Sequence, residues 1–368
     1  MDEWSGLPDA LRAALHAAAP PMHDSAGQAV AADAWTHWPI EPLADRGLAH
    51  QHLRLLGTGV LARVPKQSQM RLAAADNLRY QAACFERAAP SGHVPRLIGL
   101  LPVSAALPYG ALLVEEITGR AARLPQDLGA IVCSLAALHA LPLPSVEQAA
   151  PLLHAEDPLR DLLHEIEAQV QHGEAAASAS ARAVLLDELQ ALRRRCSDAA
   201  RPPRTLIAFD GHPGNFVVRD DGRAILVDLE KCRYSHPGLD LAHATLYTST
   251  TWDMQVRAVL SPQALHQAYA QWERVVPVAL AAAARPWHVP LARAMWLWSL
   301  SWCAKWLALS QRAPSASADG EDWSADRSDP ALIAHVRERV LHYLSDAGMA
   351  AARHGIDALQ QWAGHPGA

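Results

Sequence analysis

The stretch 205–230, TLIAFDGHPGNFVVRDDGRAILVDLE, decides the fold of this chain. An apolar run leads into a polar loop that begins at Asp210, and two further apolar runs flank a Gly-containing turn at 219–223. Short apolar runs around such a turn predict a β-hairpin. The hairpin would hold Asn215 at its entrance and Asp228 at its exit. We therefore expect these two side chains and Asp210 to face one point.

Two carboxylates and an amide oxygen at one point suit phosphoryl transfer. One carboxylate accepts the proton of the attacking hydroxyl, and the other two groups hold the Mg²⁺ that bridges the nucleotide phosphates. Asp210 and Asn215 keep a D-x-x-x-x-N spacing, and Asp228 follows thirteen residues later, about one hairpin in length. The alternative is an ordinary Asp/Asn/Gly-rich turn between strands. Each residue alone favours the turn, but the joint spacing favours the site.

Three segments resemble the aminoglycoside phosphotransferase and choline kinase group. They are AFDGHPGN (208–215), VDLE (227–230) and PGLDLAHAT (237–245), where that group has HGD-x-HPGN, I-D-W/F-E and G-x-x-x-D-L-A. The resemblance implies an α+β, bilobal protein-kinase-like fold, with a small β-rich N-lobe and a larger, mostly helical C-lobe. The chain departs from the pattern at Ala208 and Phe209, where His-Gly is usual.

The resemblance also assigns roles to the residues that match. Asp210 is the catalytic base, and Asn215 and Asp228 are the metal ligands. His212 is a secondary candidate, because protein kinases keep a lysine there that touches the transferred phosphate. Glu230, two residues after Asp228, is a secondary candidate for the metal shell.

The expected N-lobe carries the nucleotide-binding residues. Arg63 matches the strand cation that grips the phosphates, with Lys66 as the nearby alternative. On the helix that follows, Gln81 stands where kinases have the Glu that pairs with this cation, and it can form a hydrogen bond with Arg63. The segment 111–119 resembles the hinge. There the main chain contacts the base, so the candidate positions are Glu115, Glu116 and Ile117.

The length of 368 residues, half of them apolar, suits two lobes. We predict an N-terminal helix and linker over 1–34, the N-lobe over 35–117 and the C-lobe over 118–368. Within these, apolar periodicity and helix stop signals predict a helix that starts at 239, after the break at 236–238, and nine others. Their ranges are 7–18, 72–89, 127–139, 157–171, 178–196, 261–272, 291–311, 330–344 and 349–362.

Composition limits the partners and the compartment. The net charge of −6 and the lack of a Lys/Arg-rich stripe argue against a nucleic-acid partner. The longest apolar run, 275–284, is too short to cross a bilayer, so no membrane partner is expected. Five scattered cysteines without C-x-x-C spacing indicate reduced thiols, and the N-terminus shows no signal peptide. We therefore expect a cytoplasmic protein whose partner is a small-molecule substrate.

The sequence gives little information about the acceptor site. Trp298, Trp302 and Trp306 repeat every four residues and share a helix face, which could form an aromatic wall for an amine. The more frequent role of such residues is packing in the core. The segment 313–328 is predicted to be a mobile loop. Its acidic residues could attract a polyamine, although such a run is more often solvated.

The sequence thus predicts a kinase that uses Mg²⁺ and ATP or GTP. It would move the γ-phosphoryl group to a hydroxyl of a small acceptor, with amine-bearing acceptors among the candidates. The alternative is a weak or inactive pseudokinase-like protein that binds a nucleotide or metabolite, favoured by Ala208 and Gln81. A hydrolase acting on water has no supporting motif. The choice between ATP and GTP, the acceptor and the oligomeric state are not encoded in any motif.

Overall fold

The computed structural model describes residues 6–18, 22–23, 29–30, 38–45, 47–172 and 178–364. The chain forms two compact units, each built from separate stretches of sequence. The first unit comprises 1–89, 94–118 and 310–334, and the second comprises 90–93, 119–309 and 335–368. Part of the linker predicted within 1–34 lies outside the described residues.

The first unit is built on a five-stranded antiparallel sheet. In spatial order its strands are β3 (Ile40–Pro42), β4 (His50–Leu55), β5 (Val60–Pro65), β7 (Ala111–Glu115) and β6 (Leu97–Leu101). A short hairpin of β1 (Met22–His23) and β2 (Ala29–Val30) precedes it. A tight turn joins β4 to β5. Gly57 and Gly59 there have φ angles of 80° and 68°, a left-handed conformation that glycine adopts without strain.

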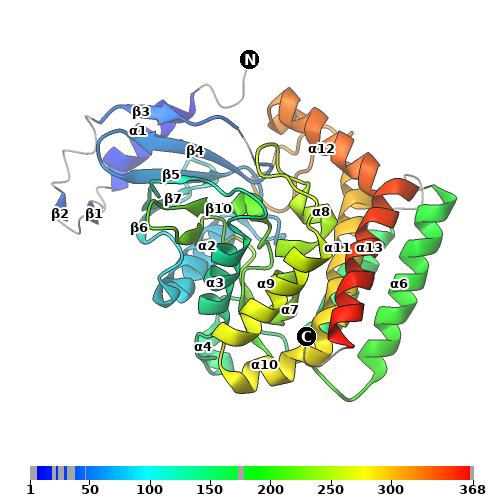
Figure 1. Cartoon of the computed structure of the whole chain (residues 1–368). Helices are drawn as coiled ribbons and strands as arrows, with labels where there is room; N and C mark the ends of the chain where they lie inside the picture. Colours follow the sequence, from blue (N-terminus) through cyan, green and yellow to red (C-terminus); the bar gives the residue numbers. More distant parts are fainter. Residues whose placement is uncertain are drawn as a thin grey trace. The chain divides into compact units, whose positions relative to one another are not determined.

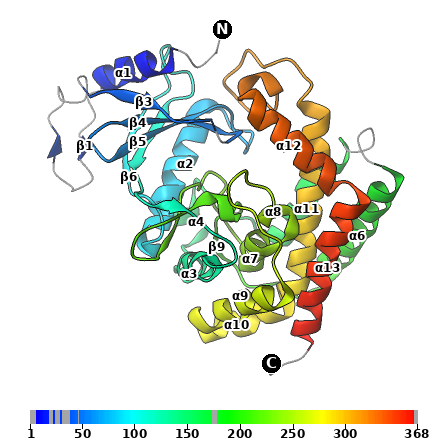
Figure 2. The same ribbon diagram turned by 45° about the horizontal axis from the view of Figure 1, so that its top comes forward.

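Helices α1 (Leu7–Ala18) and α2 (Ala74–Ala88) cover the sheet (Figure 2). Ala62 and Val64 of β5 share a buried cluster with Leu11 and Leu15 of α1. Because successive strand side chains point to opposite faces, Arg63 lies on the other face. There its guanidinium lies 5.6 Å from the ring centroid of Phe85 in α2. Strand alternation thus delivers the predicted cation to the α2 side of the sheet.

Residues 310–334 belong to the first unit, which corrects the prediction that the C-lobe runs without a break over 118–368. Asp319 accepts a hydrogen bond at 2.7 Å from the N–H of Ala74, the first residue of α2. Lys66 binds Asp45 at 2.7 Å and Ser328 at 3.0 Å. These contacts join residues far apart in sequence, so they cannot be predicted from a local sequence pattern. The segment predicted to be a mobile loop is tied to the sheet unit through its acidic and hydroxyl side chains.

The second unit is mostly helical, and α11 runs through its middle beside α6 and α13 (Figures 1 and 2). Its shorter helices include α4 (Val146–Ala149), α8 (Tyr247–Thr250), α10 (Val278–Ala284), η3 (Pro213–Asn215) and η4 (Arg285–Trp287). Its longer helices are α3 (Leu128–His139), α5 (Pro158–Val170), α6 (Ala179–Ser197), α7 (Pro237–Thr245), α9 (Pro262–Val275), α11 (His288–Leu309) and α13 (Asp346–Ala363). The helix α12 (Pro330–Tyr343) begins in the first unit and ends in the second.

The predicted helices are present, and most begin or end within three residues of the predicted bounds. The offset at three starts has one cause. Asp157, Ser178 and Ser261 are N-caps, whose side chains accept a hydrogen bond from a main-chain N–H of the first turn. Among the described residues, no helix is both long and apolar enough to span a membrane.

Two small sheets carry the loops of interest in the second unit. In one, β10 (Phe216–Val218) lies between β11 (Ala224–Leu226) and β8 (Arg120–Ala121). In the other, β9 (Thr205–Ile207) pairs with β12 (Arg233–Ser235). The predicted hairpin is confirmed as β10–β11, whereas the pairing of β9 with β12 was not foreseen.

Candidate active site

The β10–β11 hairpin brings the predicted metal ligands together. Its register pairs Phe216 with Leu226. One step further, the Val227 N–H donates to the Asn215 carbonyl at 2.9 Å. Asn215 therefore lies across the hairpin from the residue that precedes Asp228. The thirteen-residue spacing in the sequence is the length of chain that this register requires.

The loop between β9 and β10 orients the side chain of Asn215. Its Nδ2 donates to the Asp210 carbonyl at 2.9 Å, which leaves the amide Oδ1 available as a ligand. Gly214 is required by a close approach, because a Cβ atom there would lie 2.8 Å from Oδ2 of Asp253. The loop thus fixes both the Asn215 amide and the main chain of Asp210.

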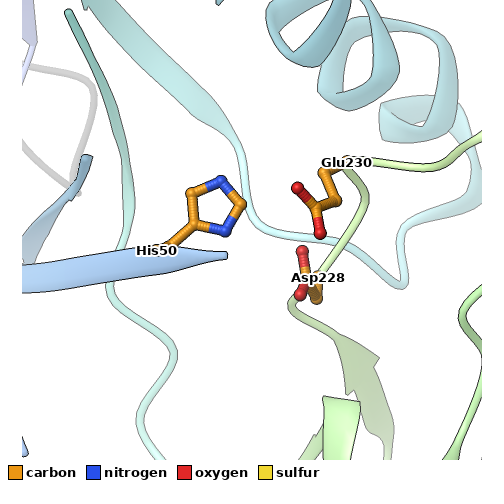
Figure 3. A group of neighbouring side chains, drawn as sticks. All are labelled: His50, Asp228 and Glu230. Carbon is orange, nitrogen blue, oxygen red and sulfur yellow. The ribbon is translucent and has the colours of Figure 1, made fainter. Parts of the chain in front are cut away.

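The Asp228 and Glu230 carboxylates point toward one another in Figure 3. Each offers an oxygen, and these oxygens lie within 4.8 Å of one another. Asn215, across the hairpin from the residue before Asp228, would add an amide oxygen to these carboxylates, and oxygen ligands are the kind that Mg²⁺ prefers. The residues therefore fit the predicted metal. The third side chain drawn there, His50, belongs to the first unit and is described with it below.

Asp210 is held by a lysine that the sequence analysis missed. Lys231 Nζ lies 2.7 Å from Oδ2 of Asp210, and His243 Nδ1 lies 3.8 Å from Oδ1. Burial alone would raise the pKa of Asp210, but the charge of Lys231 holds it below its usual value. Burial opposes the charge on Lys231 too, but Asp210 and then Glu230 raise its pKa. Both partners are therefore charged at neutral pH.

Asp240 supports the main chain at Ala208 and Phe209, where the chain departs from the family pattern. Asp240 accepts hydrogen bonds from the main-chain N–H groups of Ala208 at 2.7 Å and Phe209 at 2.8 Å. His139 Nε2 lies 3.1 Å from the same carboxylate. Phe209 has a φ of 58°, a conformation that bulky residues rarely adopt. The loop keeps its support although the usual His-Gly pair is missing.

His212, the secondary candidate, has a role within the loop. Its Nδ1 accepts a hydrogen bond from the Gly214 N–H at 3.2 Å. The centroid of its ring lies 5.9 Å from that of His243. Burial lowers the pKa of His243 to about 4, so His243 is neutral at physiological pH. His243 therefore provides no fixed positive charge beside Asp210, as Lys231 does.

The three tryptophans do not form a continuous accessible wall. Trp306 is 1% exposed and lies in the core. Trp298 donates its indole N–H to Glu165 at 2.8 Å, and Lys231 Nζ lies 5.7 Å from its ring centroid. Trp302 packs edge-on against Trp252, with 5.5 Å between the ring centroids. A cation does lie against Trp298, but it comes from the chain itself.

In the first unit, a histidine lies between the two residues that were expected to meet. His50 Nδ1 lies 3.5 Å from Nη2 of Arg63, and its Nε2 lies 2.9 Å from Oε1 of Gln81. His50 therefore links Arg63 to Gln81. Lys66, the alternative cation, binds the carboxylate of Asp45 at 2.7 Å. No sequence pattern marks His50, because the pairing of β4 with β5 places it.

The three hinge candidates differ in their ion pairs and main-chain hydrogen bonds. Glu115 pairs with Arg96 at 3.4 Å, and Glu116 pairs with Arg54 at 2.6 Å. The Glu116 N–H donates to the Gly59 carbonyl at 2.8 Å. Within the described part of the chain, the main chain of Ile117 has no hydrogen-bond partner. Of the three candidates, Ile117 is the one whose main chain is available for a nucleotide base.

Comparison with solved structures shows the fold. A putative aminoglycoside phosphotransferase from Ralstonia eutropha has a TM-score of 0.59 at 14% identity, covering 96% of this chain and 98% of that one. A choline/ethanolamine kinase family protein from Mesorhizobium loti has a TM-score of 0.57 at 16% identity, covering 96% and 99%. The GDP complex of aminoglycoside 2'-phosphotransferase-IIIa has a TM-score of 0.51 at 15% identity, covering 89% and 92%. The chain therefore has the kinase-like fold that the resemblance implied.

Comparison of sequences places the chain in a family. No curated protein sequence is significantly similar to it. A sequence profile of the phosphotransferase enzyme family matches residues 52–278, more than half of the chain and the whole of the stretch that carries Asp210, Asn215 and Asp228. The protein belongs to the phosphotransferase enzyme family.

Proposed function

We propose that this phosphotransferase moves the γ-phosphoryl group of ATP or GTP to a hydroxyl of a small molecule, with Mg²⁺ as cofactor. One observation carries the proposal. A charged base, Asp210, shares a loop with an amide oxygen, Asn215, and the hairpin adds the Asp228 and Glu230 carboxylates. A base beside an all-oxygen metal site is the donor set that phosphoryl transfer uses.

Each residue of the second unit has a separate task in this proposal. Asp210 accepts the proton of the acceptor hydroxyl, and Lys231 keeps Asp210 ionised until then. Asn215 Oδ1 and Asp228 hold Mg²⁺, with Glu230 contributing to its shell. When bound, the metal ion neutralises charge on the nucleotide phosphates.

The first unit supplies the proposed nucleotide contacts. Arg63 is the cation for the phosphates, oriented by its contacts with His50 and Phe85. The main chain of Ile117 is the candidate contact for the base. A nucleotide co-substrate is supported by the GDP complex of aminoglycoside 2'-phosphotransferase-IIIa, which shares this fold. We propose ATP or GTP, because main-chain contacts leave no side chain that distinguishes them.

The acceptor in this proposal is a small molecule with a hydroxyl group. Some proteins with this fold are described as choline/ethanolamine kinases and others as aminoglycoside phosphotransferases, whose acceptors bear amines. Amine-bearing acceptors are therefore one class to test, although Lys231 already occupies the face of Trp298. We further propose that the protein acts in the cytoplasm, without a nucleic-acid or membrane partner.

The pseudokinase-like alternative rests on Ala208 and Gln81. The structure weakens both grounds. Ala208 keeps its main-chain hydrogen bond to Asp240, and Gln81 is linked to Arg63 through His50. An active enzyme is the better supported of the two functions.

The test of the proposed function is a thermal-shift panel with ATP, GTP and their hydrolysis-resistant analogues, each with and without Mg²⁺. A ligand that binds only the native state raises its stability with the logarithm of ligand concentration over Kd. We expect a shift with one nucleotide that depends on Mg²⁺. The absence of a shift with every nucleotide would overturn the kinase proposal.

A further inference from the structure

Lys231 reaches the catalytic loop through strand pairing. The antiparallel pairing of β9 with β12 sets Ile207 opposite Arg233. Beyond this pair, β9 leads into the loop that carries Asp210, and Lys231 lies two residues before Arg233. The ammonium group then meets Asp210, with 2.7 Å between Nζ and Oδ2. The lysine therefore belongs to the active-site loop although twenty-one positions separate the two residues in sequence.

The hydrogen bonds of Lys231 are incomplete. An ammonium group has three N–H donors. Within the described part of the chain, Lys231 Nζ donates only to Asp210, and one side of it faces the ring of Trp298. Its side chain is only 9% exposed, so little water can complete the set. Buried charged groups normally have their hydrogen bonds satisfied. The unused donors therefore indicate an anionic or oxygen-rich ligand.

A second buried lysine shows what a purely structural ion pair looks like in this protein. Lys66 donates to Asp45 at 2.7 Å and also to the Gly47 carbonyl and the Ser328 hydroxyl, both at 3.0 Å. Its three donors are satisfied by the protein alone. Lys231 differs from it in having donors left over, and these lie beside the catalytic base.

The unused donors lie within reach of the transferred group. A base contacts the acceptor hydroxyl at about 2.6–3.2 Å. The reacting oxygen and phosphorus approach to about 3–3.5 Å before the bond forms. A cation that touches the same carboxylate can therefore contact the equatorial oxygens of the phosphoryl group as it passes to the acceptor.

We propose that Lys231 is a further catalytic residue, one that donates hydrogen bonds to the phosphoryl group during its transfer. The inference rests on the proposed function. In the step, the bond from the acceptor oxygen to phosphorus forms and the bond from phosphorus to the β-phosphate oxygen breaks. The hydroxyl proton passes to Asp210, and Lys231 keeps all its protons. Its charge stabilises the oxygens on which negative charge is concentrated.

The test uses ADP and GDP with Mg²⁺, alone and with aluminium fluoride, a planar anion that stands in for the transferring phosphoryl group. Neither arm requires the acceptor to be known. For the wild-type chain we expect aluminium fluoride to tighten diphosphate binding at least tenfold. In Lys231→Met this tightening should fall at least tenfold, while the affinity for the diphosphate alone changes less than twofold. Arg223→Met, which removes an exposed cation from the β10–β11 turn, is the matched control and should keep the tightening.

A second pair of variants separates catalysis from structure. Lys231→Met alone leaves Asp210 without its buried partner, which can impair folding. Asp210→Asn and Asp210→Asn/Lys231→Met are compared instead, because neither contains the ion pair. We expect the first to retain the tightening by aluminium fluoride and the second to lose it. A merely structural lysine would leave these two variants equal.

The outcomes also separate the two proposals. Failure of the wild-type chain to bind any nucleotide overturns the proposed function. Diphosphate binding without tightening by aluminium fluoride, or equal tightening in the two Asn variants, overturns the role of Lys231 alone. As a kinetic check, slow NTP hydrolysis in Lys231→Met should lose about 10²–10³-fold in kcat with an almost unchanged KM for the nucleotide.

Discussion

The guanidinium of Arg233 lies 3.7 Å from the ring centroid of Phe209, the residue just before the proposed catalytic base, Asp210. The edge of the same ring packs against Trp298, with 5.3 Å between the ring centroids. These contacts hold a bulky residue at a φ of 58°. Backbone strain of this kind costs about 1–3 kcal/mol and persists only where the surroundings fix it.

The strain at Phe209 predicts an unusual order of stability. Phe209→Ala and Phe209→Gly both lose a ring that is 1% exposed, at a cost of about 3–5 kcal/mol. Alanine keeps the strain and glycine relieves it, so the glycine variant should be the more stable of the two by about 1 kcal/mol. Urea denaturation of both variants measures this. A more stable alanine variant would contradict the strained conformation.

Removing the base should separate chemistry from binding. Asp210→Asn should lower NTP turnover about 10²–10⁴-fold, because the proton acceptor is lost. The affinity for the nucleotide should stay within a few-fold, since Asp210 is not a phosphate ligand in the proposed function. Turnover and calorimetric binding are measured on the same preparation. A large loss of nucleotide binding would mean that the site is misassigned.

In the proposed function, Asp228 and Glu230 should contribute unequally to Mg²⁺ binding. Asp228→Asn should raise the Mg²⁺ concentration needed for nucleotide binding by at least tenfold, and Glu230→Gln should raise it by less. The measurement is a Mg²⁺ titration at fixed nucleotide concentration. Asp221→Asn, in the exposed turn of the same hairpin, is the matched control and should leave the midpoint unchanged. An unchanged midpoint in Asp228→Asn would exclude this carboxylate from the metal shell.

His236 should make stability depend on pH. Burial lowers its pKa to about 4, while the unfolded chain retains the ordinary value near 6.5. The unfolded state therefore binds more protons between these values. The contribution of His236 is fully present above about pH 6.5 and is lost toward pH 4, by about 1.4 kcal/mol per pH unit at most. Relative to His236→Gln, the wild type should lose stability over this window in urea denaturation. If the free energies of unfolding of the wild type and His236→Gln changed with pH in parallel, His236 would not be the source of the pH dependence.

The segment 310–334 should contribute to the stability of the sheet unit. Asp319→Ala removes the acceptor for the Ala74 N–H at the start of α2, and the free energy of unfolding should fall by about 1 kcal/mol, as for a lost helix cap. Asp326→Ala, an exposed change in the same segment, serves as the control. Equal stability of the two variants would show that this contact contributes nothing.

Features encoded by local spacing were predictable from the sequence. The hairpin and the positions of Asp210, Asn215 and Asp228 follow from one continuous stretch, because a short turn fixes the register. The helix starts follow from capping residues such as Ser178 and Ser261, whose effect extends only one turn.

Features created by distant pairing were not predictable. Lys231 reaches Asp210 through the β9–β12 pairing, and His50 reaches Arg63 through the β4–β5 pairing. Neither residue lies in a motif, because its partner is chosen by a register that the sequence does not reveal. The same holds for Lys66 and Ser328, whose hydrogen bond joins residues 262 positions apart.

That long-range hydrogen bond bears on how the protein is made. The sheet unit takes its last segment, 310–334, from beyond most of the helical unit. On the ribosome, the strands around Arg63 emerge first, but Lys66 cannot bind Ser328 until 262 further residues have been synthesised. N-terminal domains commonly fold first during synthesis. Here the sheet unit can be completed only after residue 328 has been synthesised, so a fragment cut after the hinge would leave Lys66 without one of its hydrogen-bond partners.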